Sequence, residues 1–485
     1  MTTKSAADRL IPTQPTSGSV REPASFRDPI GFVYRRDGVL YRQISARHAA
    51  DWQAFVGSGL FGQLVERGWL IEHDEAPREL AHDEDAWRVL RPRPLGFISY
   101  PYEWAFSQLK DAALLTLDVQ SAALEAGMSL RDASAYNVQF DFSRPVMIDA
   151  LSFEKRREGE PWVAYRQFCQ HFLAPLALMA LTDVRTSVLL RDFIDGVPLD
   201  LAARLLPASS RLRFGLAAHL HLHARAQGRR RGSAQPSAAG EDNGGGQRGR
   251  PRLAADRLEA LIASLRAAVA GLHWRPAGTT WADYGDTTSY SSPAAASKRE
   301  IVGRMLRATD GDWLWDLGAN TGYFSRLAAD MGRQVVALDA DHGAAEQHYR
   351  AVRDDPALPR ILPLVVDLTN PSPALGWAHA ERQSLLGRAN AQTLLALALV
   401  HHLAIGNNVP LERISELFAA LGRELIVEFV PKSDRRVAEM LAWRQDVFGA
   451  YSLDGLRAAF DARWQLIADE QIEDSQRTLL HYRRR

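Results

Sequence analysis

The stretch "DLGANTGYFSRLA", residues 316–328, follows the apolar run "WLW" and decides the fold of the second half of the chain. Asp316 stands at the end of an expected strand, and Gly318 and Gly322 stand in the turn that leads from it into an amphipathic segment. In an open α/β sheet, the first turn of this kind offers backbone N–H groups and lets a ligand approach closely. We therefore expect this turn to bind a ligand.

Five apolar runs in this half alternate with helical or loop segments. Such runs are typical of parallel strands that are covered on both faces. The pattern predicts a Rossmann-like, doubly wound α/β domain with a mainly parallel sheet. Helices at about 253–272 and 294–308 are expected before the first strand. The runs are "WLWDL", "QVVALD", "ILPLVVD", "TLLALAL" and "ELIVEFV".

Two further acids end the next two expected strands. Asp339 lies 23 residues after Asp316 and is placed to accept hydrogen bonds from both hydroxyls of a ribose, while Asp367 is placed to contact an adenine amino group. Three acids at successive strand ends favour a nucleoside that carries positive charge, because they would repel a pyrophosphate. The turn also lacks the middle glycine of G-x-G-x-x-G, so NAD is disfavoured.

At these residues the chain resembles the class I S-adenosylmethionine-dependent methyltransferases, whose first motif is D/E-x-G-x-x-x-G. The resemblance covers about residues 276–485. It implies that Asp316, Gly318, Asn320 and Gly322 cradle the methionine part of S-adenosylmethionine, that Asp339 holds the ribose and that Asp367 contacts the adenine. Tyr290 and Lys298, upstream of the first strand, are candidates for covering this cofactor, with a plain helix cap and a surface lysine as the alternative.

The fourth strand ends in "VHHLAIGNN", where methyltransferases of this class often carry a His-Leu sequence. A neutral imidazole of His401 or His402 could act as general base on an acceptor hydroxyl, and either ring could instead only shape the pocket. Glu428, Lys432 and Asp434, at the end of the fifth strand, are candidates for the acceptor pocket.

The first half of the chain predicts an α+β arrangement, with sheet first and helices after. "FVYRRDGVLYRQI" is typical of a hairpin that turns at Asp37-Gly38, and helices are expected over about 46–72. Residues 95–127 predict a strand that leads into a long amphipathic helix ending at Gly127. "YNVQFDFSRPVMIDALSF" predicts a second hairpin, and residues 160–227 are mostly helical in pattern.

This half, over about residues 30–225, more weakly resembles protein kinases and aminoglycoside phosphotransferases. Asp132, Asn137 and Asp149 stand in the order of the catalytic Asp, the Asn that binds magnesium and the metal-binding Asp of those enzymes. Arg42 stands where a lysine is wanted, and Asp149 is followed by alanine instead of Phe-Gly. The resemblance implies a degenerate phosphotransferase site, with structural turn residues as the alternative.

Two other patterns favour structural roles. Gly57, Gly59 and Gly62 spell G-x-G-x-x-G, but they join two expected helices instead of a strand and a helix, which disfavours phosphate binding. His219, His221 and His223 are close in sequence, yet no Glu-x-x-His pattern or cysteine completes a metal site nearby. We therefore expect packed or exposed histidines and no metal.

Composition gives the expected domain organisation. We expect a disordered tail over residues 1–25, an α+β domain with the kinase-like resemblance over 26–227, and the helical lead-in with the methyltransferase domain over 253–485. Between them, residues 228–252 hold seven glycines and six arginines without a large apolar residue, so a disordered linker or loop is expected.

Charge and hydropathy limit the partners. Lys plus Arg and Asp plus Glu both number 58, so a nucleic-acid partner is disfavoured. Apolar stretches are too short to span a membrane, no secretory signal is recognised, and the single cysteine, Cys169, fits a reducing compartment. These features predict a cytoplasmic protein with no membrane contact.

The sequence thus predicts an enzyme that transfers a methyl group from S-adenosylmethionine. The two-part layout resembles that of some bacterial nodulation-type or natural-product methyltransferases, which favours a sugar or small-molecule O or N acceptor and leaves a protein acceptor open. One alternative is a phosphotransferase with an accessory methyltransferase-like domain. Another is a non-catalytic interaction protein.

Overall fold

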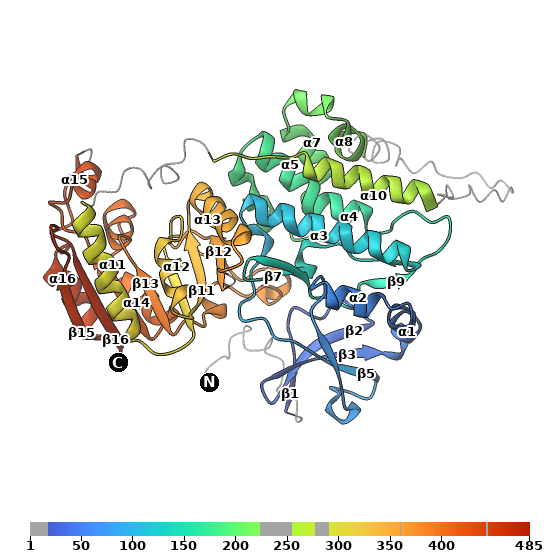
Figure 1. Cartoon of the computed structure of the whole chain (residues 1–485), viewed down its shortest axis with the longest axis horizontal. Helices are drawn as coiled ribbons and strands as arrows, with labels where there is room; N and C mark the ends of the chain where they lie inside the picture. Colours follow the sequence, from blue (N-terminus) through green and yellow to red (C-terminus); the bar gives the residue numbers. More distant parts are fainter. Residues whose placement is uncertain (1–17, 224–254, 277–290, 359, 443–444) are drawn as a thin grey trace, which may run out of the picture.

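The computed structural model describes residues 18–223, 255–276, 291–358, 360–442 and 445–485. Tyr290, the linker expected over 228–252 and most of the tail expected over 1–25 lie outside these ranges. Figure 1 shows a large sheet formed by the second half of the chain on one side, a smaller sheet formed by the first half on the other, and helices between and above them.

The second half forms a seven-stranded sheet in the order β12-β11-β10-β13-β14-β16-β15. The first five strands in this order pair in parallel, and β16 runs antiparallel to β14 and β15. This topology confirms the predicted Rossmann-like α/β fold, and all five predicted strands are present. The strands are β10 (Trp313–Leu317), β11 (Gln334–Asp339), β12 (Ile361–Val365), β13 (Thr393–Ala396), β14 (Glu424–Phe429), β15 (Trp464–Gln471) and β16 (Thr478–Arg484).

Helices cover both faces of this sheet. α11, α12 and α13 pack on the face that carries Leu314 and Ile426, and α14 and α16 pack on the face that carries Trp315 and Leu425. Both faces are apolar because side chains alternate along each strand. The helices of this half are α11 (Ser292–Arg307), α12 (Tyr323–Asp330), α13 (His342–Asp354), α14 (Leu411–Leu421), α15 (Arg435–Leu441) and α16 (Leu453–Asp461).

The first half begins with a five-stranded antiparallel sheet in the order β1-β2-β3-β5-β4. The predicted hairpin is present, with positive φ at Asp37 and Gly38. The expected disordered tail was too long, because residues 19–21 pair with β2. The elements are β1 (Ser19–Arg21), β2 (Gly31–Arg36), β3 (Val39–Ser45), α1 (Ala49–Gly57), α2 (Leu60–Glu66), β4 (His73–Ala76) and β5 (Ala86–Pro92).

The long helix α3 (Phe106–Glu125) follows and ends before Gly127, as predicted. The strand predicted before it is wrong: residues 95–100 form no strand, and a short 3-10 turn, η4 (Pro101–Glu103), leads into the helix. The second hairpin is present. The remaining elements are β6 (Met128–Leu130), β7 (Val138–Asp141), β8 (Arg144–Met147), β9 (Phe153–Lys155), α4 (Tyr165–Phe168), α5 (Ala174–Leu181), α6 (Leu189–Asp192), α7 (Leu199–Leu205), α8 (Phe214–Leu216) and α10 (Ala255–Ala270).

The two halves share a buried contact. Helix α3 packs against α13, and η4 packs against β12, the strand at the edge of the large sheet. The ring of Phe142 stacks on Trp313 with centroids 5.9 Å apart, and Phe97 meets Trp315 edge to face at 5.4 Å. The first half therefore covers the sheet edge that carries Asp367.

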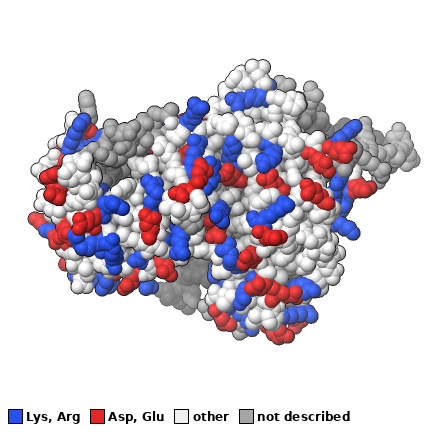
Figure 2. All heavy atoms as spheres, viewed as in Figure 1, with Lys and Arg blue, Asp and Glu red and all other residues white. Residues whose placement is uncertain are grey.

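Positive and negative side chains are interspersed over the face drawn in Figure 2, as the balanced composition predicts. Among the described residues, no helix has both the length and the apolar character needed to cross a bilayer.

Candidate active site

The turn between β10 and α12 has the backbone of a ligand-binding loop. Gly318, Asn320 and Gly322 have φ values of +75°, +51° and +82°, so three of five residues are left-handed. Asn320 is stabilised in this conformation because its side-chain oxygen accepts a hydrogen bond from the Thr321 amide at 2.6 Å. The turn thus presents backbone amides at the carboxyl end of β10, as predicted.

Asp316 is buried at the end of β10, with 3% of its surface exposed. Ser325, in the first turn of α12, donates its hydroxyl to the carboxylate at 2.6 Å. Burial raises the pKa of Asp316 to about 6, and the Ser325 hydrogen bond opposes that rise. Sequence reasoning missed Ser325, although its place three residues after Gly322 was a usable signal.

Asp339 ends β11 and supports the same turn. Its carboxylate accepts hydrogen bonds from the amide of Asn320 at 2.7 Å and from the amide of Asp341 at 2.8 Å. Burial raises the pKa of Asp339 to about 6, against the effect of these amides. Each carboxylate oxygen keeps a second lone pair, so Asp339 can still accept from a ligand.

Asp367 lies two residues beyond β12 and is exposed. Its carboxylate accepts hydrogen bonds from the Thr369 amide at 2.8 Å and the Thr369 hydroxyl at 2.6 Å. Asp367 therefore lies at the same end of the sheet as the other two acids but closer to solvent.

The structure brings the three acids to one end of three neighbouring strands. Asp316 pairs with Ala337, so Asp316 and Asp339 project from the same face of the sheet, and Asp339 pairs with Val365. The charge of Asp339 contributes to the raised pKa of Asp316. An arrangement of this kind attracts a cation and hydrogen-bond donors.

The raised pKa of Asp316 has a consequence for stability. An acid whose pKa is higher in the folded than in the unfolded state destabilises the fold increasingly as pH rises from about 4 to about 6, and by a constant amount above. We expect Asp316→Asn to raise the free energy of unfolding at pH 8 by about 1–2 kcal/mol, and by less near pH 4. Urea unfolding at both pH values measures this, and an equal effect at both would contradict it.

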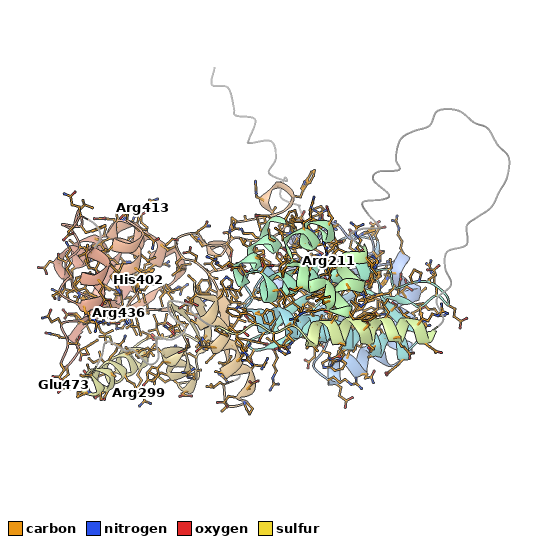
Figure 3. All side chains as sticks on the ribbon, turned by 90° about the horizontal axis from the view of Figure 1, so that it is seen from above. Arg211, Arg299, His402, Arg413, Arg436 and Glu473 are labelled. Carbon is orange, nitrogen blue, oxygen red and sulfur yellow. The ribbon has the colours of Figure 1, made fainter. Side chains whose placement is uncertain are left out.

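His401 and His402 follow β13, with ring centroids 4.1 Å apart. Burial lowers the pKa of His401 to about 3 and that of His402 to about 4, and the nearby charge of Arg436 contributes to the second shift. Figure 3 labels His402 and Arg436 near each other on this side of the molecule. Both imidazoles are therefore neutral near pH 7, but their low pKa makes them weak general bases.

The three residues expected at the acceptor rim differ in their surroundings. Glu428 is fully buried and forms ion pairs with Lys298 and with Arg477. No motif in the sequence pointed to Arg477. Asp434 caps α15 and bonds to the Arg477 Nε at 2.8 Å. Lys432 is more exposed and pairs with Asp446 at 2.7 Å.

The phosphotransferase-like residues of the first half form a closed cluster. The Asn137 amide donates to the Ser152 hydroxyl at 3.1 Å, which donates to Asp149 at 2.6 Å. Burial raises the pKa of Asp149, but the ion pair with Arg42 and the hydrogen bonds from the Ser152 hydroxyl and the Leu151 amide together outweigh burial and bring the pKa below its usual value.

Asp132 accepts from the Ser134 amide at 2.9 Å, and burial raises its pKa. The carboxylate of Asp149 is paired with the guanidinium of Arg42 on β3, at the position where a kinase-like enzyme would hold magnesium. Within the described residues, no group of three His, Cys, Asp or Glu side chains could hold a metal ion.

The two patterns assigned structural roles lie in ordinary surroundings. Gly57 and Gly59 lie at the joint between α1 and α2, and Gly62 lies inside α2. His219 is within hydrogen-bond distance of the Tyr165 hydroxyl at 2.8 Å and of the Ser264 hydroxyl at 2.9 Å. The Nε2 of His221 lies 2.8 Å from the Ser210 hydroxyl.

No protein-family model matches the chain. Among solved structures, it is similar to magnesium protoporphyrin IX methyltransferase (ChlM) from Synechocystis PCC 6803 with bound SAM, at 16% identity over 43% of this chain and 86% of that one, with a TM-score of 0.29. It is also similar to the N-methyltransferase NodS from Bradyrhizobium japonicum WM9, at 9% identity over 40% and 98% of the two chains, with a TM-score of 0.30.

A third similar structure is the bifunctional kinase-methyltransferase WbdD, at 14% identity over 39% of this chain and 37% of that one, with a TM-score of 0.27. With such low TM-scores these likenesses carry no functional weight, and the proposal below rests on the residues of this chain.

A curated relative matches over nearly the whole length. The nodulation protein NoeA of Rhizobium meliloti (strain 1021) is 34% identical over 484 residues, which cover 99% of each protein. The chain therefore belongs to the NoeA family.

Proposed function

We propose that this protein is an S-adenosylmethionine-dependent methyltransferase whose second half binds the methyl donor. The observation that carries the proposal is the glycine-containing, left-handed turn at the end of β10, which is held by the carboxylate of Asp339 at the end of β11 and flanked by Asp316 of β10 and Asp367 beyond β12. The donor supplies an electrophilic methyl group on a sulfonium.

Each acid has a proposed role that its surroundings support. Asp316, ionised above about pH 6, pairs with the donor's ammonium group. Asp339 accepts from the ribose hydroxyls with the lone pairs that the two amides leave open. Asp367, which is exposed beyond the carboxyl end of β12, accepts from the adenine amino group. Tyr290, outside the described residues, stays a candidate cover.

The histidines are proposed to orient the acceptor. A neutral His402 can accept a hydrogen bond from an acceptor O–H or N–H, which aligns the nucleophile. His401, which is more deeply buried, packs against this ring at an interplanar angle of 39° and so limits its movement. Methyl transfer is an in-line displacement that depends mainly on alignment, so two weak bases are compatible with it. The proposed acceptor is an O or N atom of a sugar or small molecule, with a protein acceptor as the alternative.

Calorimetric titration with S-adenosylhomocysteine tests the donor site. We expect wild-type protein to bind this product, and Asp339→Asn to weaken binding about 10- to 150-fold, because a charged hydrogen bond is worth about 1.5–3 kcal/mol. Asp330→Asn, which removes an exposed carboxylate from α12, is the matched control and should bind normally. No binding by wild-type protein would refute the proposal.

The same titration with ATP and magnesium tests the phosphotransferase alternative. The hydrogen-bonded chain of Asn137, Ser152 and Asp149 is the observation that favours it, and the Arg42 ion pair opposes it. Magnesium-dependent ATP binding that Asp149→Ala abolishes would support this second activity. Failure to bind any nucleotide or S-adenosylhomocysteine would favour an interaction protein.

A further inference from the structure

Four charged side chains form a buried network beside the proposed donor site. Lys298 of α11 donates to Glu428 of β14 at 2.6 Å. Arg477, directly before β16, bonds to the other oxygen of Glu428 at 3.2 Å and to Asp434 at 2.8 Å. Side-chain exposure is 8% for Lys298, 3% for Arg477 and 0% for Glu428. The two cations balance the two carboxylates.

Lys298 also reaches the turn that holds the donor. Its ammonium nitrogen lies 5.1 Å from the ring centroid of Phe324 on α12, next to Ser325, the residue that bonds to Asp316. Its charge stabilises the ionised form of Asp316. One buried cation therefore acts on carboxylates from two strand ends, Asp316 of β10 on the donor side and Glu428 of β14 on the acceptor side.

We infer that Lys298 is a positioning residue of the methyl-donor site, which keeps Asp316 available as an anion and fixes the end of β14 through Glu428. The inference rests on the proposed function, because the role of Asp316 is to hold the donor. Burying four charges is costly, and a well-packed apolar cluster would stabilise the fold at least as well. The presence of charged instead of apolar side chains in this buried network therefore favours a role in binding over a role in stabilising the fold.

The surroundings of Asp316 define how this role depends on pH. Three groups from the elements packed around it affect its charge: the Ser325 hydroxyl of α12 and the Lys298 ammonium of α11 favour the ionised form, and the Asp339 carboxylate of β11 opposes it. The neighbour on β13 is the apolar Leu395. Glu428, in turn, faces Lys298, Arg477 and His401.

Removal of the lysine charge should therefore raise the pKa of Asp316. With Lys298 present, the pKa of Asp316 is about 6, so binding of an ammonium group should weaken as pH falls through 6. Without that cation the pKa of Asp316 rises further, and binding should begin to weaken at a higher pH.

The test is the pH dependence of S-adenosylhomocysteine binding by the full chain between pH 5.5 and 8.5. We expect Lys298→Met to bind at least about 10-fold more weakly at pH 7 and to lose affinity at a higher pH than wild type. Lys298→Arg, which keeps the charge, should restore both. Lys155→Met, which changes an exposed lysine of β9, is the matched control.

If Lys298→Met does not fold, Lys298→Met/Glu428→Gln carries the same test, because it removes the lysine charge together with the carboxylate charge that balances it. A variant that binds with the wild-type affinity and pH midpoint would overturn the inference while leaving the proposed function intact. No binding by wild-type protein at any pH would overturn both.

Discussion

Replacement of Gly322 by alanine is expected to lower the free energy of unfolding by about 2–5 kcal/mol and to abolish S-adenosylhomocysteine binding. The φ of Gly322 is +82°, and an added Cβ would lie 2.0 Å from the Nε2 of His348. His348, on α13, is buried with 1% exposure, so its ring cannot move aside without displacing the helix. Urea unfolding and calorimetry measure the two effects.

Two variants separate strain from steric overlap. Gly332 has a similar φ of +88° but nothing within 4 Å of an added Cβ, so Gly332→Ala should cost only about 1–2 kcal/mol. His348→Ala makes room beside Gly322, so adding it to Gly322→Ala should cost less than the sum of the two single changes. Equal destabilisation by Gly322→Ala and Gly332→Ala would contradict the steric explanation.

The parallel strands and the donor turn were predictable because their signals are local. Runs such as "QVVALD" are apolar on both faces, and an acid marks the end of each of the first three. The hairpin β15–β16 was not predicted, because β15 is the edge strand and exposes side chains on both faces, including the adjacent residues Leu466 and Ile467. The pattern of such a strand carries little burial signal.

Contacts between segments far apart in sequence were not predictable. Sequence reasoning considered Lys298 as a cover for the donor or a surface residue, whereas the structure buries it against Glu428, 130 positions away. Arg477 carried no motif at all. Likewise, the low pKa of His401 and His402 follows from burial, which a His-Leu motif does not encode. The His-Leu motif predicted where these rings lie in the fold but not their lowered pKa.

The junction of the two halves contains a buried ion pair. Arg388, between β12 and β13, donates to Glu103 of η4 at 3.0 Å and to the Ile98 carbonyl at 2.6 Å. Its guanidinium lies 4.4 Å from the ring centroid of Tyr100. Side-chain exposure is 3% for Arg388 and 1% for Glu103. The pair therefore joins the first half to the donor-binding half with almost no access to solvent.

Arg388→Met should lower the free energy of unfolding by about 3–5 kcal/mol, because it leaves the Glu103 carboxylate buried without its cation. Glu103→Gln/Arg388→Met, which removes both charges and keeps an acceptor for the Tyr100 amide, should recover at least half of that loss. The control is Arg185→Met. Arg185 also binds one carboxylate, that of Asp183, through two nitrogens, but its side chain is 80% exposed. This exposed pair should contribute less than about 1 kcal/mol to the free energy of unfolding.

The shape of the urea unfolding curve shows whether Arg388→Met lowers the free energy of unfolding by separating the two halves or by destabilising them as one unit. If the pair holds the halves together, Arg388→Met should split the transition in two, and S-adenosylhomocysteine should stabilise only the part that contains Asp339. A single transition with an unchanged slope would show that the halves unfold as one unit even without the pair. In that case the aromatic contacts of Trp313 with Phe142 and of Trp315 with Phe97, not the ion pair, would be sufficient to join them.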